Sequence, residues 1–371
     1  MENNKTVEVV NFGKSVIVPS VQELAKESTT HVPSRYVRVQ ENDNDSTMDC
    51  PINQTSPVSV PVIDLQRLLH GYSKDSELDK LHLACKEWGF FQVINHGVSI
   101  SLLETFKEEV TNFLKLPMEE KKKLWQQEDN HEGFGQLFVV SEDQKLDWCD
   151  MFYVITLPPK LRKPHLFNNL PQNIRVIMEA YAVAMKGLAQ TILNHMAKAL
   201  GINEGEMVEL FGEGWQSIRM NYYPPCPEPH KAIGITPHSD ADSLTILYQL
   251  NDIQGLQVKK DGNWVPVIPL ENAFVVNLGD CMEILSNGIY RSIEHRATVN
   301  STKERISVAT FHSSNIDYEL GPAKSIVGPL NPPLFRTEPL KQYYRGFFAR
   351  KLNGKSYLDV MRLQQGDLNT S

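Results

Sequence analysis

Residues 236–247 read TPHSDADSLTIL, and residues 289–312 read IYRSIEHRATVNSTKERISVATFH. Both stretches contain short runs of β-branched and aromatic side chains, which favour strands. Similar runs recur from about residue 215 onward, separated mostly by Gly, Asn, Asp or Pro: SIRMNYY, SLTILYQL, GLQV, NWVPV, AFVVNLGD, YRSIEHRATV and RISVATF. Many short strands between turn residues predict an antiparallel sandwich or barrel in this part of the chain.

The first half of the chain shows mainly helical periodicity. Ser20 and Glu23 have the S-x-x-E spacing of a capping box, which predicts the start of a helix. Apolar side chains recur at helical spacing within 78–88, 103–113 and 173–200, and Gly201 is suited to end the last of these helices. VPVIDL (60–65) and FFQVI (90–94) read as strands. We therefore expect a mainly β fold with a helical layer and an N-terminal α/β region.

Composition limits the partners of the protein. Its 371 residues include 37 basic and 45 acidic side chains, a net charge of −8, which argues against binding to nucleic acid or to an anionic membrane. The five cysteines form no CxxC pair, and the N-terminal MENNKTVEVV lacks the apolar core of a secretory signal. No run of 18 apolar residues occurs. We expect a cytoplasmic protein that acts on a small molecule, without a membrane or an obligate protein partner.

His238 and Asp240 are two residues apart, a spacing that places both side chains on the same side of an extended backbone. His295 lies in a later β segment that can pair with theirs in an antiparallel sheet. Two histidines and one carboxylate on one face form the triad typical of non-haem iron(II) oxygenases. The tripeptide alone is common, however, and the same ligands could hold zinc for hydrolysis.

Arg305 and Ser307 begin another β segment and face the same way. A guanidinium and a hydroxyl suit a carboxylate, which arginine binds in a bidentate manner. A dicarboxylate co-substrate would chelate the metal at one end and need such an anchor at the other. The alternative for Arg305 is an ordinary ion pair, with Glu304 or with a neighbouring strand.

Taken together, these motifs resemble the plant 2-oxoglutarate/iron(II)-dependent dioxygenase superfamily over roughly residues 18–363. The resemblance includes ACKEWGFFQVINHGV, MNYYPPCP, TPHSDADSLTIL, VVNLGDCMEILSNGIYRSIEHRATVN and KERISVATFH. It implies a double-stranded β-helix, or jelly roll, buttressed by helices. It also implies Fe²⁺ on His238, Asp240 and His295, with 2-oxoglutarate and O₂ as co-substrates and ascorbate as a stimulant.

The resemblance extends to further site residues. It implies that Arg305 and Ser307 hold the distal carboxylate of 2-oxoglutarate together with Tyr223. Asn221 would lie near the metal-bound end of the same molecule. Phe311 would face the substrate pocket, although a phenylalanine in a strand is otherwise an ordinary core residue.

The domain organisation follows from the same reading. Residues 1–59 would form an N-terminal helix and a loose linker, and 60–165 an N-terminal dioxygenase region. Residues 166–213 would form a long buttressing helix, 214–314 the jelly roll with the iron and 2-oxoglutarate sites, and 315–371 a C-terminal helical tail.

Within the superfamily, SVQELAK, EGFGQ, SEDQKLDW and LRKPHLF resemble the senescence-related-gene-like and alkaloid O-demethylase branch. This resemblance implies hydroxylation or oxidative O-demethylation of a plant alkaloid, flavonoid or other phenolic, with release of succinate and CO₂. Three alternatives remain open here: an ascorbate-dependent oxidase of the same fold, a non-catalytic binding protein on this scaffold, and a zinc hydrolase.

Overall fold

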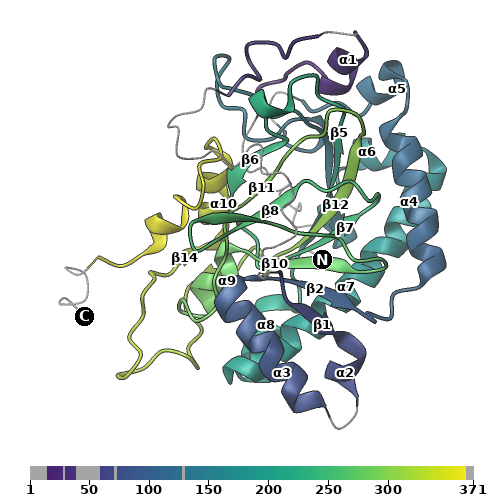
Figure 1. Cartoon of the computed structure of the whole chain (residues 1–371). Coiled ribbons are helices and arrows are strands. Elements are labelled where there is room, and N and C mark those ends of the chain that lie inside the picture. The colour runs from purple at the N-terminus through teal and green to yellow at the C-terminus, as the bar shows by residue number, and fades with distance from the viewer. Residues whose placement is uncertain (1–14, 28–29, 39–58, 71–72, 128–129, 365–371) are drawn as a thin grey trace, which may run out of the picture.

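The computed structural model describes residues 15–27, 30–38, 59–70, 73–127 and 130–364. Two β-sheets face each other, and helices cover the outer face of the larger one (Figure 1). Most of the linker expected before residue 59, and the last seven residues of the expected C-terminal tail, lie outside the described residues.

The large sheet has eight strands in the order β1-β2-β10-β7-β12-β5-β4-β3. In chain order their bounds are β1 (Val62–Asp64), β2 (Phe90–Ile94), β3 (Gly133–Gly135), β4 (Asp150–Leu157), β5 (Gln216–Tyr223), β7 (Leu244–Gln249), β10 (Phe274–Leu278) and β12 (Arg305–His312). All neighbours are antiparallel except β1 and β2, which run parallel. The VPVIDL and FFQVI segments form strands, as expected, and these strands extend one edge of the large sheet.

The small sheet has four antiparallel strands in the order β6-β11-β8-β9. Their bounds are β6 (Ile235–His238), β8 (Leu256–Lys260), β9 (Asn263–Pro266) and β11 (His295–Ala297). A separate two-stranded pairing joins β13 (Glu319–Leu320) to β14 (Glu338–Pro339). Apolar side chains from both main sheets, among them Phe90, Leu247 and Val258, form one buried cluster between them. This is the sheet-on-sheet arrangement of a jelly roll, confirming the expected fold class.

The α-helices are α1 (Val21–Lys26), α2 (Leu65–Leu69), α3 (Lys74–Leu83), α4 (Ile100–Leu114), α5 (Met118–Lys122), α6 (Pro164–Asn169), α7 (Gln172–Leu200), α8 (Glu204–Phe211), α9 (Asp280–Leu285) and α10 (Leu340–Phe348). Single turns of 3₁₀-helix are η2 (Pro159–Leu161), η3 (Pro229–Lys231) and η4 (Leu358–Met361).

Helix α7 is the main support of the large sheet. Its apolar face packs against β4, β7 and β12, and its Tyr181 stacks on Phe106 of α4 with 3.7 Å between ring centroids. Each fully buried large side chain in such an interface contributes about 1.5–3 kcal/mol. Gly201 ends α7 in the left-handed conformation, as the sequence predicts. By length and composition α7 could also cross a membrane, but buried core helices meet the same criterion.

Several predicted elements differ from those observed. The helix expected over 78–88 is α3 continued by a π-helical turn, η1 (Ala84–Trp88), which ends at Gly89. Strand β6, which ends at His238, was not predicted, nor was helix α9, whose first residue ends the segment AFVVNLGD. The segment YRSIEHRATV forms a strand only over β11. These differences all concern short elements whose tertiary contacts outweigh weak local preferences.

Candidate metal and co-substrate site

The pairing of β6 with β11 brings the predicted metal ligands together. In the antiparallel register of these strands, His295 lies directly opposite His238. The i, i+2 argument assumed that an extended strand continues from His238 to Asp240. Instead, β6 ends at His238, and Asp240 reaches the two histidines from the loop that follows. Phe90 of β2 packs edge-on against the His295 ring, with 5.2 Å between centroids.

One nitrogen of each histidine and one carboxylate oxygen lie within 4.8 Å of one another. Asp240 Oδ1 is 3.5 Å from His238 Nε2 and 3.7 Å from His295 Nε2. All three side chains are buried. Ligand atoms at this separation can bind a single divalent ion with bonds of about 2.0–2.2 Å.

The remaining polar atoms of the three side chains are held by the protein. Nδ1 of His238 faces the carbonyl oxygen of Thr236 at 2.8 Å, and Nδ1 of His295 faces that of Ile293 at 3.2 Å. Each Nδ1 must carry the ring proton, because only an N–H can donate to a carbonyl oxygen. Nε2 is then unprotonated, and its lone pair is available to a metal ion. Such outer contacts orient metal-binding histidines and fix their tautomer.

The Asp240 carboxylate is fixed in the same way. Its Oδ2 accepts hydrogen bonds from the Thr245 hydroxyl at 2.6 Å and from the Asn277 amide at 2.7 Å. Oδ1 remains directed at the two histidines. Neither Thr245 nor Asn277 was singled out from the sequence, because polar residues inside strands β7 and β10 carry no spacing signal of their own.

Burial and charge keep Asp240 and His295 in the states that metal binding needs. Burial alone would raise the pKa of Asp240, but the neighbouring His295 and His238 hold the pKa of this carboxyl well below its usual range. Burial, with the neighbouring His238, lowers the pKa of His295 to about 4. Asp240 is therefore ionised and His295 neutral at physiological pH, as metal ligands must be.

The three candidate ligands line a cavity, and the predicted anion anchor, Arg305 and Ser307, lines the same cavity. Arg305 Nη1 is 3.4 Å from Ser307 Oγ, and Nη2 donates to Gln249 Oε1 at 3.1 Å. The guanidinium lies over the Tyr223 ring, 5.1 Å from its centroid. Glu304, the alternative partner, is turned away and pairs with Lys115 at 2.5 Å. Arg305 is thus held by neutral groups, so its charge is available to an anion.

Strand register explains why the other expected residues lie there. Tyr223 and Asn221 of β5 stand directly opposite Arg305 and Ser307 of β12, so all four face one cavity. Burial raises the pKa of Tyr223, which therefore stays protonated as a hydrogen-bond donor. Within the described residues, two buried atoms of these four side chains, Asn221 Oδ1 and Arg305 Nε, have no hydrogen-bond partner.

Phe311 also lines this cavity. Arg219, which was not predicted, also lines it from β5, and its buried Nε has no hydrogen-bond partner among the residues that the structure describes. Leu247, Leu256 and Ala309 provide apolar walls. The three candidate metal ligands, the anion anchor and an apolar surface thus line one cavity.

These residues fit an iron(II) ion and 2-oxoglutarate. Two imidazoles and one carboxylate are the donor set that non-haem iron prefers, and they leave coordination positions open. The unpaired polar atoms and the free positive charge of Arg305 match a dicarboxylate that spans from the metal to the arginine.

Comparison with known proteins also indicates an oxygenase that uses iron(II) and 2-oxoglutarate. Residues 214–314 match the family model of the 2OG-Fe(II) oxygenase superfamily. Residues 60–173 match the model described as non-haem dioxygenase in morphine synthesis N-terminal. Together these matches cover more than half of the chain.

Individual relatives align over nearly the full length. The oxoglutarate-dependent flavonoid 7-O-demethylase 1 of Ocimum basilicum is 52% identical, covering 95% of this chain and 93% of its own. Codeine O-demethylase of Papaver somniferum is 48% identical, covering 96% and 99%. The crystal structure of JOX2 in complex with 2OG, Fe and JA superposes with a TM-score of 0.82 at 34% identity, covering 94% of this chain and 98% of that one.

Proposed function

Because this chain belongs to the plant 2-oxoglutarate/iron(II)-dependent dioxygenases, we propose that it oxidatively O-demethylates or hydroxylates a flavonoid or alkaloid. The coarser statement, an oxygenase of specialised metabolism that uses Fe²⁺, 2-oxoglutarate and O₂, follows from the family itself. The finer one is supported by two relatives that remove methyl groups from a flavonoid and from codeine.

We assign His238, Asp240 and His295 as the iron ligands. The observation that carries this assignment is the convergence of three otherwise unengaged donor atoms within 4.8 Å. When bound, iron would supply the chemistry that couples the oxidative decarboxylation of 2-oxoglutarate by O₂ to the oxidation of a substrate C–H bond. The protein supplies a fixed ligand face, because Thr245 and Asn277 leave Asp240 only one free oxygen.

We further propose that Arg305, Ser307 and Tyr223 hold the distal carboxylate of 2-oxoglutarate, and that Asn221 lies beside its metal-bound end. A charge-assisted bidentate contact from Arg305 would orient the co-substrate as well as bind it. Phe311 and the apolar walls would exclude water and position the substrate C–H.

O-demethylation balances as one oxygenation. One oxygen atom of O₂ enters the methyl C–H bond of an aryl methyl ether, and the other enters succinate as 2-oxoglutarate loses CO₂. The resulting hemiacetal breaks its C–O bond to give formaldehyde and a free hydroxyl. Hydroxylation of another carbon uses the same residues and differs only in which C–H bond faces the metal.

The test is an incubation of the purified protein with methoxylated flavonoids and alkaloids, Fe²⁺, ascorbate and 2-oxoglutarate, followed by mass spectrometry. Loss of one methylene with equimolar formaldehyde and succinate would establish demethylation, whereas gain of one oxygen would establish hydroxylation. Turnover that continues without 2-oxoglutarate and needs only ascorbate would instead indicate the ascorbate-dependent oxidase.

We also infer a cytoplasmic location. It is supported by the four cysteines of the described residues, Cys85, Cys149, Cys226 and Cys281, all of which are free and buried.

A further inference from the structure

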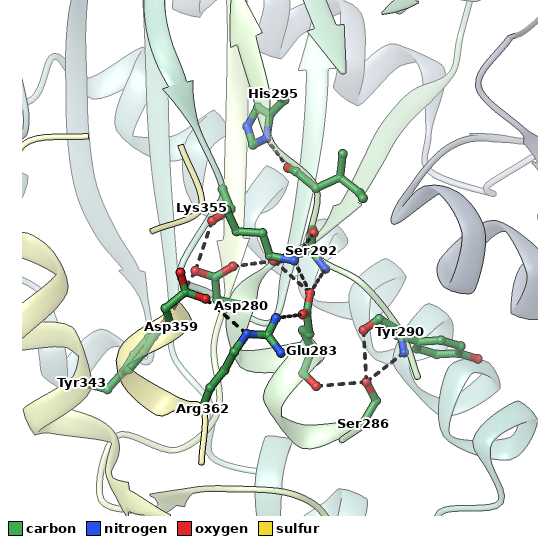
Figure 2. A network of polar contacts seen from close by, with 12 residues as sticks. Asp280, Glu283, Ser286, Tyr290, Ser292, His295, Tyr343, Lys355, Asp359 and Arg362 are labelled. Carbon is green, nitrogen blue, oxygen red and sulfur yellow. Dashed lines mark hydrogen bonds and ion pairs between the residues drawn. The ribbon is translucent and has the colours of Figure 1, made fainter. Parts of the chain in front are cut away.

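A buried acidic pair, Asp280 and Glu283, lies in the polar network below His295 (Figure 2). Helix α9 carries Asp280 and Glu283, whose side chains are almost completely buried. Asp280 Oδ2 accepts from Ser239 Oγ at 3.1 Å, and its Oδ1 accepts from Ser292 Oγ at 2.5 Å. Ser239 stands between the ligands His238 and Asp240, and Ser292 precedes His295 by three residues. One carboxylate therefore joins the two chain segments that carry the ligands.

The backbone of α9 adds to this connection. The amide of Asp280 donates to the carbonyl oxygen of Asp240 at 2.7 Å, and the amide of Cys281 donates to that of Ala241 at 3.2 Å. Gly279 makes this approach possible, since a Cβ there would lie 1.9 Å from the carbonyl oxygen of Asp242. The loop that carries Asp240 is therefore held directly on the N-terminal end of α9.

The C-terminal segment reaches the same two places. Gly354 pairs with the end of β6: its amide donates to the carbonyl of Pro237 at 2.9 Å, and its own carbonyl accepts from the amide of Ser239 at 3.3 Å. The next residue, Lys355, donates to the carbonyl oxygen of Ser292 at 2.6 Å and forms an ion pair with Glu283. Two consecutive residues thus contact both ligand-bearing segments.

Glu283 completes the connection on the His295 side. Its Oε2 accepts from the amide of Ser292 at 2.8 Å, and its Oε1 accepts from Arg362 at 3.1 Å. Ser292 is consequently held through its amide, its hydroxyl and its carbonyl oxygen. Figure 2 shows how Lys355 and Arg362 converge on Glu283 from the C-terminal segment, with His295 above.

We propose that Asp280, Glu283 and Lys355, here called the ligand clasp, are positioning residues that set the affinity of the metal site. This inference rests on the ligand assignment proposed above. The clasp fixes the separation of the β6 and β11 ends, and so the distance between the donor atoms of His238, Asp240 and His295. The C-terminal segment is accordingly part of the metal site, although it provides no ligand.

Lys355 is the most informative residue to change. Its side chain retains about a quarter of its exposure (27%), whereas that of Glu283 retains 5%, so a methionine at 355 can be accommodated. Lys355→Met frees the Ser292 carbonyl and leaves Glu283 with Arg362 as its remaining basic partner. Loss of groups that orient metal ligands lowers metal affinity roughly 10- to 100-fold.

The experiment is an anaerobic Fe(II) titration of the metal-free full-length protein, with the rate of iron loss to a chelator as a second readout. Lys355→Met should bind iron at least about 10-fold more weakly and release it faster, and Lys355→Arg should restore most of the affinity. The control is Lys163→Met, which removes a somewhat more buried ion pair, 3.3 Å long, to Glu132. Glu132 accepts from the amide of Ile155 and so holds β4, not a ligand segment.

The outcomes distinguish a failure of the ligand clasp proposal from a failure of the ligand assignment. His295→Ala should abolish tight binding whether or not the clasp exists, so retained binding in that variant would contradict the proposed ligands. If His295→Ala loses iron but Lys355→Met matches Lys163→Met, only the clasp is wrong. Should Lys355→Met not fold, Ser292→Ala removes one hydroxyl of the same network, and unchanged iron affinity in that variant overturns the inference.

Discussion

At the residue scale, the site depends on which atoms are left free. Each proposed ligand has one polar atom engaged by the protein and one directed at the other two ligands. The R-x-S spacing reflects strand geometry, because Arg305 and Ser307 both lie in β12. The H-x-D spacing predicts the right pair of side chains, although Asp240 follows the end of β6 in a turn. The sequence does not predict Thr245 or Asn277, because their role depends on which strands become neighbours.

Thr245→Val tests the orientation of Asp240. The substitution keeps the shape of the side chain and removes the hydroxyl that donates to Oδ2 at 2.6 Å. We expect iron affinity to fall about 10- to 100-fold, measured by anaerobic titration, while Thr245→Ser retains it. Equal affinity of the valine and serine variants would contradict this role.

Arg305→Lys tests the carboxylate anchor. Lysine keeps the charge but loses the fork that permits bidentate contact, so the KM for 2-oxoglutarate should rise while the KM for the organic substrate changes little. A lost charge-assisted hydrogen bond of about 1.5–3 kcal/mol corresponds to roughly 10- to 150-fold. Parallel rises in both KM values would argue that Arg305 acts on the pocket as a whole.

At the element scale, long elements are predictable and short ones are not. The 3.6-residue period predicts α4 and α7, since many turns repeat the same pattern. Strand β6 carries His238 but spans only Ile235–His238 and contains a proline, so its strand character comes from pairing with β11. The π-helical turn η1 likewise ends where Gly89 packs against the Arg291 carbonyl, a contact that no local pattern reveals.

Two glycines, Gly187 within α7 and Gly201 at its C-cap, should respond oppositely to replacement by alanine. Gly187 is helical, exposed and surrounded by open space, so Gly187→Ala should raise the free energy of unfolding by about 0.5–1 kcal/mol. Gly201 caps the helix at a φ of +74°, so Gly201→Ala should lower it by about 1 kcal/mol. Denaturant unfolding of both variants checks the signs, and a stabilised Gly201→Ala would contradict the cap.

At the scale of the whole molecule, the packing of the helical layer and the two sheets buries side chains that would otherwise titrate. Burial, with the nearby charge of Lys186, lowers the pKa of His312 at the end of β12 to about 3. The unfolded chain therefore binds a proton at this residue, between about pH 6.5 and 3, that the folded protein does not.

This difference predicts acid sensitivity. The stabilising contribution of neutral His312 is fully present above about pH 6.5 and falls by up to about 1.4 kcal/mol per pH unit toward its folded pKa. His312→Gln should lose less stability than the wild type between pH 6.5 and 5, as measured by urea unfolding at each pH. Equal pH slopes for the two proteins would exclude His312 as the titrating group.

The most direct measurement of the central claim is the iron content of the purified, reconstituted protein beside His238→Ala, Asp240→Ala and His295→Ala, with succinate release assayed in parallel. We predict one iron per wild-type chain, and loss of both iron and 2-oxoglutarate-dependent succinate release in every variant. A variant that keeps one tightly bound iron and full turnover would show that the three side chains do not share a metal ion.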